Sequence, residues 1–199
     1  AGDLWDNTLL NTDAAAVTHM APIASKSGDN LIVYALPTLV DGLAVGVSLQ
    51  AAQTTGSSSM AYGATYTGVE GLSVSAGIGE TNDVKGVTGD QTIMKASYSY
   101  GSFTVAASKN EFDHTTATID QEVSSFSLAY TLSDQISVSY GEETIDRVGK
   151  GNDIEVAGIG ISYTSGGMSV SFNQTEADNV NHTAGLDNSL WNIGLSFAF

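Results

Sequence analysis

The chain has 199 residues and a formal net charge of −16, because 22 Asp and Glu residues outweigh 6 Lys and Arg residues. An acidic excess of this size repels the phosphate backbone, which argues against nucleic acid as a partner. The sequence contains no cysteine, which excludes disulfides, thiolate metal sites and a cysteine nucleophile. Charged residues make up only 14% of the chain, below the roughly 25% of an ordinary soluble domain, so long stretches are nearly uncharged.

From residue 30 onward, apolar residues alternate with small polar residues, which is the two-residue period of β-strands. No apolar run approaches the roughly 20 residues that a membrane-spanning helix requires. The sequence therefore predicts an all-β chain with eleven strands, at residues 30–36, 43–53, 58–67, 71–80, 91–100, 103–112, 121–132, 136–144, 153–163, 168–176 and 188–199.

The connections between these strands take two forms in alternation. Short turns rich in Gly, Asp and Ser, suited to tight hairpins, recur at nearly constant spacing, at residues 40–42, 69–71, 101–102, 133–134 and 165–167. The longer connections carry much of the acidic charge and lie at residues 80–90, 111–120, 142–153 and 176–187. The connections at one end of the sheet are therefore expected to be short, and those at the other end long and acidic.

Strand length separates a membrane sheet from a soluble one. Soluble strands average about five or six residues, whereas these run to about nine to eleven, the length with which a tilted strand crosses a bilayer. Strands cross hydrocarbon only as a closed ring, since no backbone donor or acceptor may stay unpaired there. Eleven is an odd number, so the first and last strands of an up-and-down sheet would run parallel. Either the count is wrong or further strands lie in another polypeptide.

Two stretches of the sequence have a family likeness. The terminal row Trp191, Ile193, Leu195, Phe197 and Phe199 resembles the signal by which outer-membrane β-proteins are recognised for insertion. Residues 30–37, Asn-Leu-Ile-Val-Tyr-Ala-Leu-Pro, precede Asp-Gly-Leu-Ala-Val-Gly-Val-Ser at 41–48. This pattern of a strand with Tyr, a turn with Pro, Gly and then the next strand resembles the general diffusion porins of Gram-negative bacteria, particularly those of alphaproteobacterial type.

The resemblance implies a transmembrane antiparallel up-and-down β-barrel of sixteen strands. Residues 30–199 would supply eleven of them, with short periplasmic turns and longer acidic extracellular loops. Residues 1–29 would be a constriction loop that folds into the lumen. The chain would then be a C-terminal portion, completed by an N-terminal porin fragment that supplies the missing strands. The family also implies a homotrimer in the outer membrane, with the C-terminus on the periplasmic side.

Candidate residues for the pore lie on this loop and on one strand. Asp3, Asp6 and Asp13, with Lys26, lie in residues 1–29. Acids in a narrow lumen raise the local cation concentration, although solvated loop acids fit the sequence as well. Lys95 falls on the polar face of its strand, as a charge on the lumen wall or an ordinary solvated residue.

Other chemistry finds little support in the sequence. The three histidines, at 19, 114 and 182, lie in loop-like stretches without metal-ligand spacing. The pair Asp113 and His114 could act in acid–base catalysis, but an exposed loop histidine is the simpler reading. The long loop containing Glu142, Glu143, Asp146 and Asp153 could collect Ca²⁺ and bridge lipopolysaccharide phosphates, or form only a hydrated acidic rim. No other cofactor is expected.

One stretch departs from the alternation, since Asp153 and Glu155 share parity with apolar Ile159 and Ile161. Either a bulge intervenes or this strand projects beyond the membrane at its acidic end. Aromatic residues near both ends of the segments are expected to form two interfacial rows, Tyr66, Tyr100, Phe103, Tyr163 and Phe197 at the short-turn end and Tyr140, Phe172 and Trp191 at the other.

These observations favour a porin that forms a water-filled, cation-preferring channel for passive diffusion of small hydrophilic solutes and ions, in contact with the lipid bilayer and lipopolysaccharide. No turnover chemistry is expected. The alternative function is a surface-exposed all-β adhesin or binding module, with the acidic loops as its contact surface. A barrel enzyme at the acidic rim, using His114, is a further rival.

Overall fold

The computed structural model describes residues 31–51, 58–82, 88–115 and 120–198. These residues form eleven strands, namely β1 (Leu31–Ala35), β2 (Leu43–Gln50), β3 (Ser59–Tyr66), β4 (Leu72–Asn82), β5 (Thr88–Tyr100), β6 (Phe103–His114), β7 (Gln121–Ser133), β8 (Ile136–Arg147), β9 (Ile154–Ser165), β10 (Met168–Asp178) and β11 (Asn188–Phe197). A 3₁₀ turn, η2 (Val180–His182), precedes β11. The described part of the chain holds no helix that is long and apolar enough to cross a membrane.

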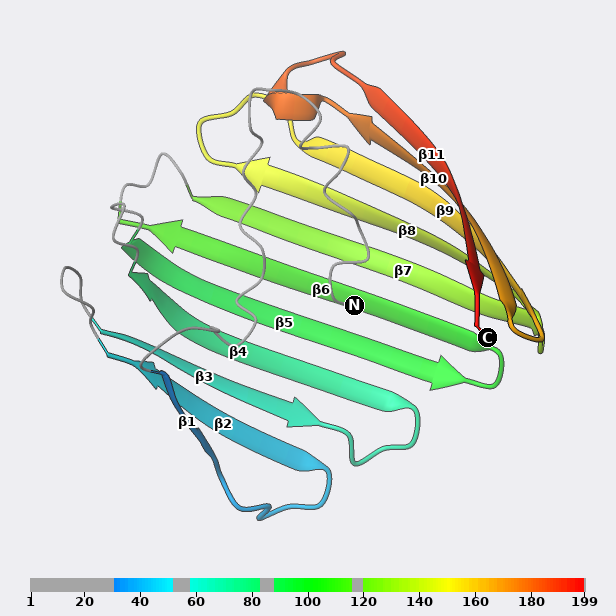
Figure 1. Ribbon diagram of the computed structural model, residues 1–199. Helices are drawn as coiled ribbons and strands as arrows, with labels where there is room; N and C mark the ends of the chain where they lie inside the picture. The colour runs from blue at the N-terminus through cyan, green and yellow to red at the C-terminus, as the bar shows by residue number, and fades with distance from the viewer. Residues whose placement is uncertain (1–30, 52–57, 83–87, 116–119, 199) are drawn as a thin grey trace.

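The strands form one antiparallel sheet in which each pairs with its neighbours in sequence, from β1 to β11. Figure 1 shows this sheet strongly curved, with all strands tilted in the same sense. The all-β, up-and-down architecture and the eleven strands predicted from the alternation are therefore confirmed. Among the described residues β1 and β11 do not pair with each other, so this part of the sheet is open.

The connections β1–β2, β3–β4, β5–β6, β7–β8 and β9–β10 lie at one end of the sheet, which we call the turn end, and the others lie at the opposite end, which we call the loop end. From β5 onward the turn-end connections are the shorter ones, as expected. The expected alternation is wrong for the first strands, because the β1–β2 connection at 36–42 is longer than the β4–β5 connection at 83–87. At the turn end Leu72 N donates to Val69 O at 3.0 Å, and Leu43 N donates to Val40 O at 3.0 Å. These hydrogen bonds close the tight turns that reverse the chain.

The pairing register is almost unbroken across the sheet. The one register shift in the described strand pairs lies between Thr131 and Ser133 in β7, next to the turn into β8. Strand β9 pairs with β8 and with β10 without interruption, including Glu155 beside Thr144 and Asp178. Of the two alternatives for this strand, a bulge between Glu155 and Ile159 is therefore wrong, and the acidic end of β9 continues the same alternation.

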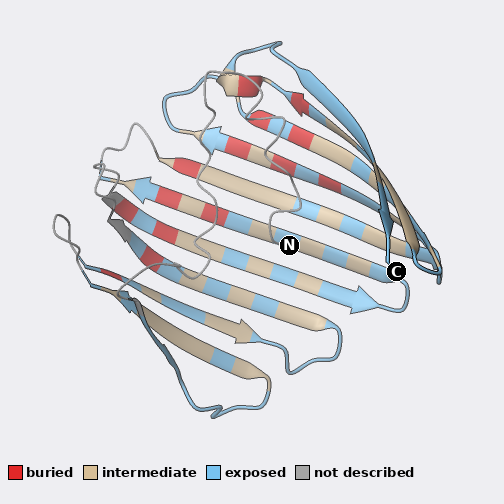
Figure 2. Cartoon of the chain, in the orientation of Figure 1, coloured by how far each residue is buried: buried red, intermediate tan, exposed pale blue. Residues whose placement is uncertain are grey.

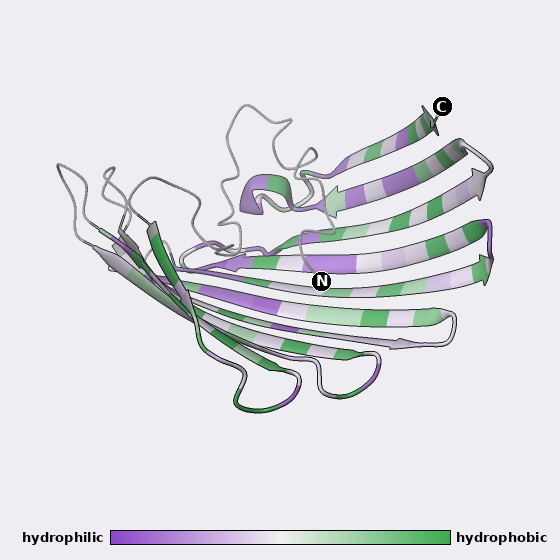
Figure 3. Cartoon of the chain, turned by 60° about the horizontal axis from the view of Figure 1, so that its bottom comes forward, coloured by the Kyte–Doolittle hydropathy of each residue, from purple (hydrophilic) through white to green (hydrophobic). Residues whose placement is uncertain are grey.

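Alternation gives the sheet two faces of different chemistry. One cross-strand row contains Tyr98, Val105, Leu128, Tyr140 and Ile159. The next row, one residue along each strand, contains Ser97, Ala106, Ser127, Gly141 and Gly158. We call the face with the apolar row the outer face and the opposite one the inner face. Figure 3 shows the resulting alternation of hydrophobic and hydrophilic bands along the strands.

Many large hydrophobic side chains on the outer face are exposed, which would be unfavourable in contact with water. Tyr100 is 74% exposed, Trp191 66% and Ile193 64%. Exposed apolar surface over many adjacent strands indicates contact with lipid or with another protein. The predicted interfacial aromatics all share this face in the pairing register, and Phe103 packs on Tyr130 with a ring-centroid distance of 4.4 Å.

Buried residues concentrate at the loop end, as the red bands in Figure 2 show. There the inner face holds an apolar cluster of Ile145, Ile154, Val156, Ala177 and Val180, each at most 4% exposed. Val180 belongs to η2, so the β10–β11 connection folds onto the inner face over β9. The polarity of the two faces is thus inverted at this end, with apolar residues inside and acidic residues outside.

Candidate functional site

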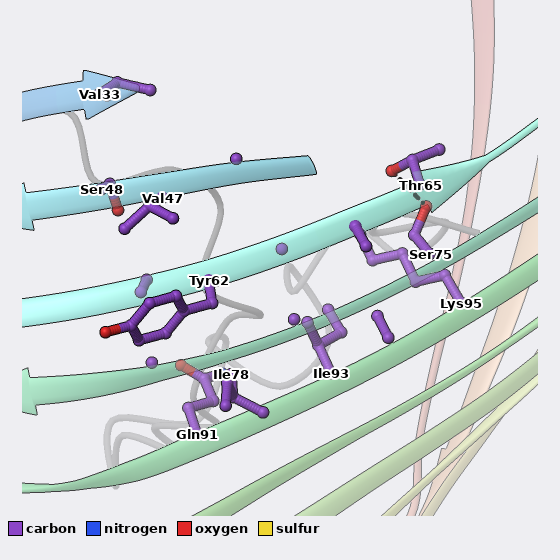
Figure 4. A pocket seen from close by; sticks show the side chains of 17 residues that line it. Val33, Val47, Ser48, Tyr62, Thr65, Ser75, Ile78, Gln91, Ile93 and Lys95 are labelled. Atoms are coloured by element: carbon purple, nitrogen blue, oxygen red, sulfur yellow. Dashed lines mark hydrogen bonds between the residues drawn. The ribbon is translucent and has the colours of Figure 1, made fainter. Parts of the chain in front are cut away.

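The inner face is the candidate functional surface because its polar, small side chains form a continuous wall. Three glycines, Gly46, Gly63 and Gly77, lie side by side on β2, β3 and β4. Since glycine projects no side chain, this row leaves a shallow hollow, whose inner-face lining also includes Ser48, Thr65, Ser75, Ile93 and Lys95. Figure 4 shows this region, with the 2.9 Å hydrogen bond between Thr65 Oγ1 and Ser75 Oγ drawn.

Hydroxyl pairs run along the same face from strand to strand. Ser108 and Ser125 are joined at 2.6 Å, Ser137 and Ser162 at 2.6 Å, and Asn173 Nδ2 donates to Asn192 Oδ1 at 3.1 Å. Such groups both donate and accept hydrogen bonds, so they exchange partners with water at little cost. A wall of this kind suits a water-filled passage.

Lys95 lies on the inner face, as its parity predicted. It stands between Ser75 on β4 and Ser108 on β6 in the same cross-strand row. Figure 4 shows its side chain extending beside Ser75 and Thr65. The other charged residues on the inner face of the described strands are Glu143 and Arg147. This wall is therefore nearly neutral, although the chain as a whole is strongly acidic.

Reversing the charge at Lys95 should change ion selectivity. A unit charge about 4 Å from an ion in water contributes roughly 1 kcal/mol, so Lys95→Glu is expected to raise the cation-to-anion permeability ratio several-fold. Reversal potentials across a KCl gradient measure this ratio. The comparison variant is Lys109→Glu, on the outer face of the neighbouring strand, which should give a smaller shift in the same direction because its charge lies outside the channel wall. Equal shifts from the two variants would contradict the assignment of inner and outer faces.

Many of the acidic residues lie on strands and not in the long loops where they were expected. Glu142, Glu143 and Asp146 were expected in a long loop, but β8 continues to Arg147 and contains all three. The parity of the strands puts ten acids on the outer face toward the loop end, Glu80, Asp90, Glu111, Asp113, Glu122, Glu142, Asp146, Glu155, Glu176 and Asp178. We call this set the acidic belt.

Within the acidic belt, like charges lie directly opposite one another on adjacent strands. Glu111, Glu122 and Asp146 form one such row, which is destabilising unless cations compensate it. Lys109 supplies part of that compensation, with Nζ at 2.6 Å from Glu111 Oε1 and 3.1 Å from Glu122 Oε2. Next to the belt, the Tyr140 hydroxyl donates to a Glu142 carboxylate oxygen. The belt therefore marks the height at which the outer face leaves the apolar band.

Two connections at the loop end, β8–β9 and β10–β11, are hydrogen-bonded to each other. His182 Nδ1 donates to the carbonyl of Asn152 at 2.8 Å, and Asn179 Nδ2 donates to the carbonyl of Asp153 at 3.1 Å. Asn179, Asn181 and His182 all adopt positive φ, which costs energy for residues other than glycine. The burial of Val180 in the apolar cluster offsets this strain and holds η2 against the inner face.

The remaining predicted site residues divide into two groups. Asp3, Asp6, Asp13 and Lys26, with the whole predicted constriction loop at 1–29, lie outside the described residues. His114, expected in a loop, is the last residue of β6 instead. Asp113 and His114 are consecutive strand residues and so point to opposite faces, which is unfavourable for the acid–base pair considered above.

No cluster of three or more His, Cys, Asp or Glu side chains that could hold a metal ion occurs in the described part of the chain. The Ca²⁺ prediction thus has no discrete ligand set among these residues. Two inner-face residues at the loop end were not singled out, Arg147 because the predicted strand 136–144 ends before it, and Gln121 although it begins the predicted strand 121–132. Their signal in the sequence is parity, since Glu143, Ile145 and Arg147 continue the polar row of Ser137, Ser139 and Gly141.

Comparisons with known proteins agree with this architecture. A family model described as Gram-negative porin matches residues 1–163. An anion-selective porin from Comamonas acidovorans has a similar fold, with a TM-score of 0.69 at 15% identity over 85% of this chain and 59% of that one. OmpF of Salmonella typhi, in a complex with daunomycin, gives a TM-score of 0.68 at 16% identity over 85% and 62%. OccK10 of Pseudomonas aeruginosa gives 0.63 at 17% identity over 85% and 63%.

The chain therefore spans about three-fifths of the length of these solved structures. A search of curated protein sequences found no match. None of these comparisons supports the alternative of an adhesin or binding module.

Proposed function

Because the chain belongs to the Gram-negative porin family, we propose that it forms wall strands of a water-filled channel in the outer membrane. Small hydrophilic solutes and ions would cross this channel by diffusion. The observation that carries the proposal is the contrast between an inner face rich in hydroxyl groups and glycine and an outer face with exposed apolar residues, which are present on strands β4 to β9 and on β11. A lipid-embedded barrel requires this contrast. The wall performs no covalent chemistry in this function.

The open sheet needs partners for its two edges in a bilayer, because unpaired backbone groups are not tolerated in hydrocarbon. We propose that five further strands, supplied by an N-terminal porin fragment, pair with β1 and β11 and close a sixteen-stranded barrel. The family resemblance also favours a homotrimer. The turn end, with the C-terminus, would face the periplasm, and the loop end would meet lipopolysaccharide at the cell surface.

We propose a preference for cations on the basis of charge at the loop end. The acidic belt and the loop acids Asp120, Asp153 and Asp187 outnumber the cationic residues Lys109, Arg147 and Lys150 of the same region. A mouth with this imbalance raises the local cation concentration. Asp3, Asp6 and Asp13 would add to the effect as part of a constriction at residues 1–29, with Lys26 beside them.

Planar lipid bilayers test the channel. The protein purified from outer membranes, with all co-purifying polypeptides, should produce stepwise conductance and a reversal potential of the sign that favours cations. Absence of conductance would overturn the channel. Anion preference would overturn the cation preference only. Replacing Asp3, Asp6 and Asp13 together by asparagine should reduce cation preference, whereas an unchanged ratio would remove their proposed role.

A further inference from the structure

At the loop end of the inner face, an arginine and a glutamine stand directly opposite each other. Arg147, the last residue of β8, pairs in register with Gln121, the first residue of β7. Side chains on directly opposite residues of antiparallel strands lie about 5 Å apart at their Cβ atoms. Both residues share the parity of Ser125 and Ser137, so both side chains belong to the channel-facing side of the sheet.

Both side chains carry a buried hydrogen-bond donor that is unsatisfied. The Nε of Arg147 and the Nε2 of Gln121 are inaccessible to solvent and have no hydrogen-bond partner. Gln121 is only 8% exposed. A buried donor without a partner is destabilising, so a group that accepts hydrogen bonds here is favoured. Arg147 itself is partly exposed, which leaves an approach to its guanidinium.

The absence of an ion pair at Arg147 is the second observation. The ion pairs formed within the described residues are both made by Lys109. In a chain with 22 acidic residues, an arginine without a carboxylate partner is unexpected, because a partly buried charge is stabilised chiefly by an opposite charge. The nearby acids are oriented or engaged elsewhere, since Asp146 is on the outer face and Asp120 Oδ1 accepts from His114 N at 2.7 Å.

The surroundings strengthen electrostatic interactions at this position. Phe112, 2% exposed, is the register partner of Gln121 on β6, and fully buried Ile145 lies one inner-face position from Arg147 on β8. Apolar neighbours lower the local dielectric, so a charged hydrogen bond is stronger here than in open water. Guanidinium and amide donors together match the two oxygens of a carboxylate, which the planar guanidinium can bind in a bidentate manner.

We propose that Arg147 and Gln121 form a docking point for the carboxylate group of small solutes at the extracellular mouth of the channel. The exposed part of the Arg147 guanidinium donates to the carboxylate, and the Gln121 side chain turns so that its Nε2, buried in the structure, donates to one of the carboxylate oxygens. The acidic belt stands on the outer face, so it does not compete for these donors. The location at the mouth rests on the proposed channel, but the docking point itself does not.

Succinate is the probe, and succinamide is its uncharged analogue of nearly equal size. Block of single-channel current is measured in 1 M KCl, where the Debye length is about 3 Å and distant charges are screened. Succinate is expected to block in a saturable manner, and succinamide is not. Arg147→Gln should raise the half-blocking concentration of succinate by about tenfold or more, since charge-assisted hydrogen bonds are the strong ones. Lys95→Gln, which also removes an inner-face cation, is the control and should change it by less than about twofold.

A second variant supplies the carboxylate from the protein itself. Gln121→Glu places an isosteric acid opposite Arg147, so it should abolish succinate block and raise the midpoint of urea unfolding. Equal block by succinamide, or equal effects of Arg147→Gln and Lys95→Gln, would overturn the docking point.

Calorimetric titration of the detergent-solubilised protein with succinate separates this inference from the proposed function. Binding that is lost in Arg147→Gln, in a particle without conductance, would sustain the docking point and overturn the channel. Conductance without succinate binding would support the channel and overturn the docking point. The partner of the two donors would then be an ordered water.

Discussion

Replacing Leu128 by arginine is expected to lower the free energy of unfolding of the lipid-embedded protein by about 1–3 kcal/mol, between the cost of a lipid-facing cation near the interface and its cost at the midplane. Leu128 lies in the outer row between Val105 and Tyr140, and residues Phe126 and Tyr130 extend the apolar band on either side of it along β7. The charge would therefore lie inside the apolar band, one outer-face position from Phe126, which is opposite Glu142 of the acidic belt. Equilibrium urea unfolding in lipid vesicles measures the change.

The neighbouring residue provides the matched control. Ser127 belongs to the inner row between Ala106 and Gly141, so Ser127→Arg should leave stability nearly unchanged and instead reduce single-channel conductance. In a soluble binding module Leu128→Arg would not lower stability in this way, because it would only add a charge to a surface in contact with water. A larger loss of stability from Ser127→Arg than from Leu128→Arg would show that the two faces have been exchanged.

Replacing Gly71 by alanine should have the second large effect. Gly71 ends the β3–β4 turn at φ +76°, and a Cβ at this position would collide with the backbone carbonyl oxygen of Ser99 on β5. The same pair of residues is joined by the hydrogen bond from Ser99 N to Gly71 O at 2.8 Å. Left-handed backbone costs about 1–2 kcal/mol for alanine, and overpacking adds about 1–3 kcal/mol.

Gly101 is the control for this prediction. It has φ +57° in the β5–β6 turn, yet a Cβ there would meet no atom within 4 Å. Gly101→Ala should therefore cost only the backbone term, about 1–2 kcal/mol. The folded fraction is measured by the electrophoretic mobility of unheated samples and by urea unfolding in vesicles. Equal losses from the two variants would mean that contact with Ser99 has no part in the effect.

The strand pattern could be predicted because one physical constraint acts on most of the chain. Wherever one face meets lipid and the other meets water, apolar and polar residues must alternate, and the predicted strand 103–112 differs from β6 only at its loop end. The same constraint predicted the inward position of Lys95. Hairpin turns were recognisable because Gly71 and Gly101 occupy backbone conformations that favour glycine.

The alternation fails as a guide where the environment changes. Beyond Tyr140 the outer face of β8 carries Glu142 and Asp146, while Ile145 on the inner face packs under Val180. In this part of β8 the apolar residues therefore lie on the inner face and the acidic residues on the outer face. A prediction that requires apolar residues on the outer face ends the strand too early. Arg147 was lost for this reason. Parity alone would have placed Arg147 on the inner face, but its apolar surroundings depend on the β10–β11 connection and so on contacts between residues distant in sequence.

The nearly unbroken register has a consequence for how such a sheet can change in size. Because each hairpin joins two strands through a turn and keeps the same residues facing outward, a whole hairpin can be gained or lost without exchanging the faces of its neighbours. A single added strand would instead leave the last strand running in the wrong direction for its partner. The circumference of such a wall is therefore free to vary in steps of two strands, and with it the width of the opening, while the chemistry of each remaining strand stays as it is.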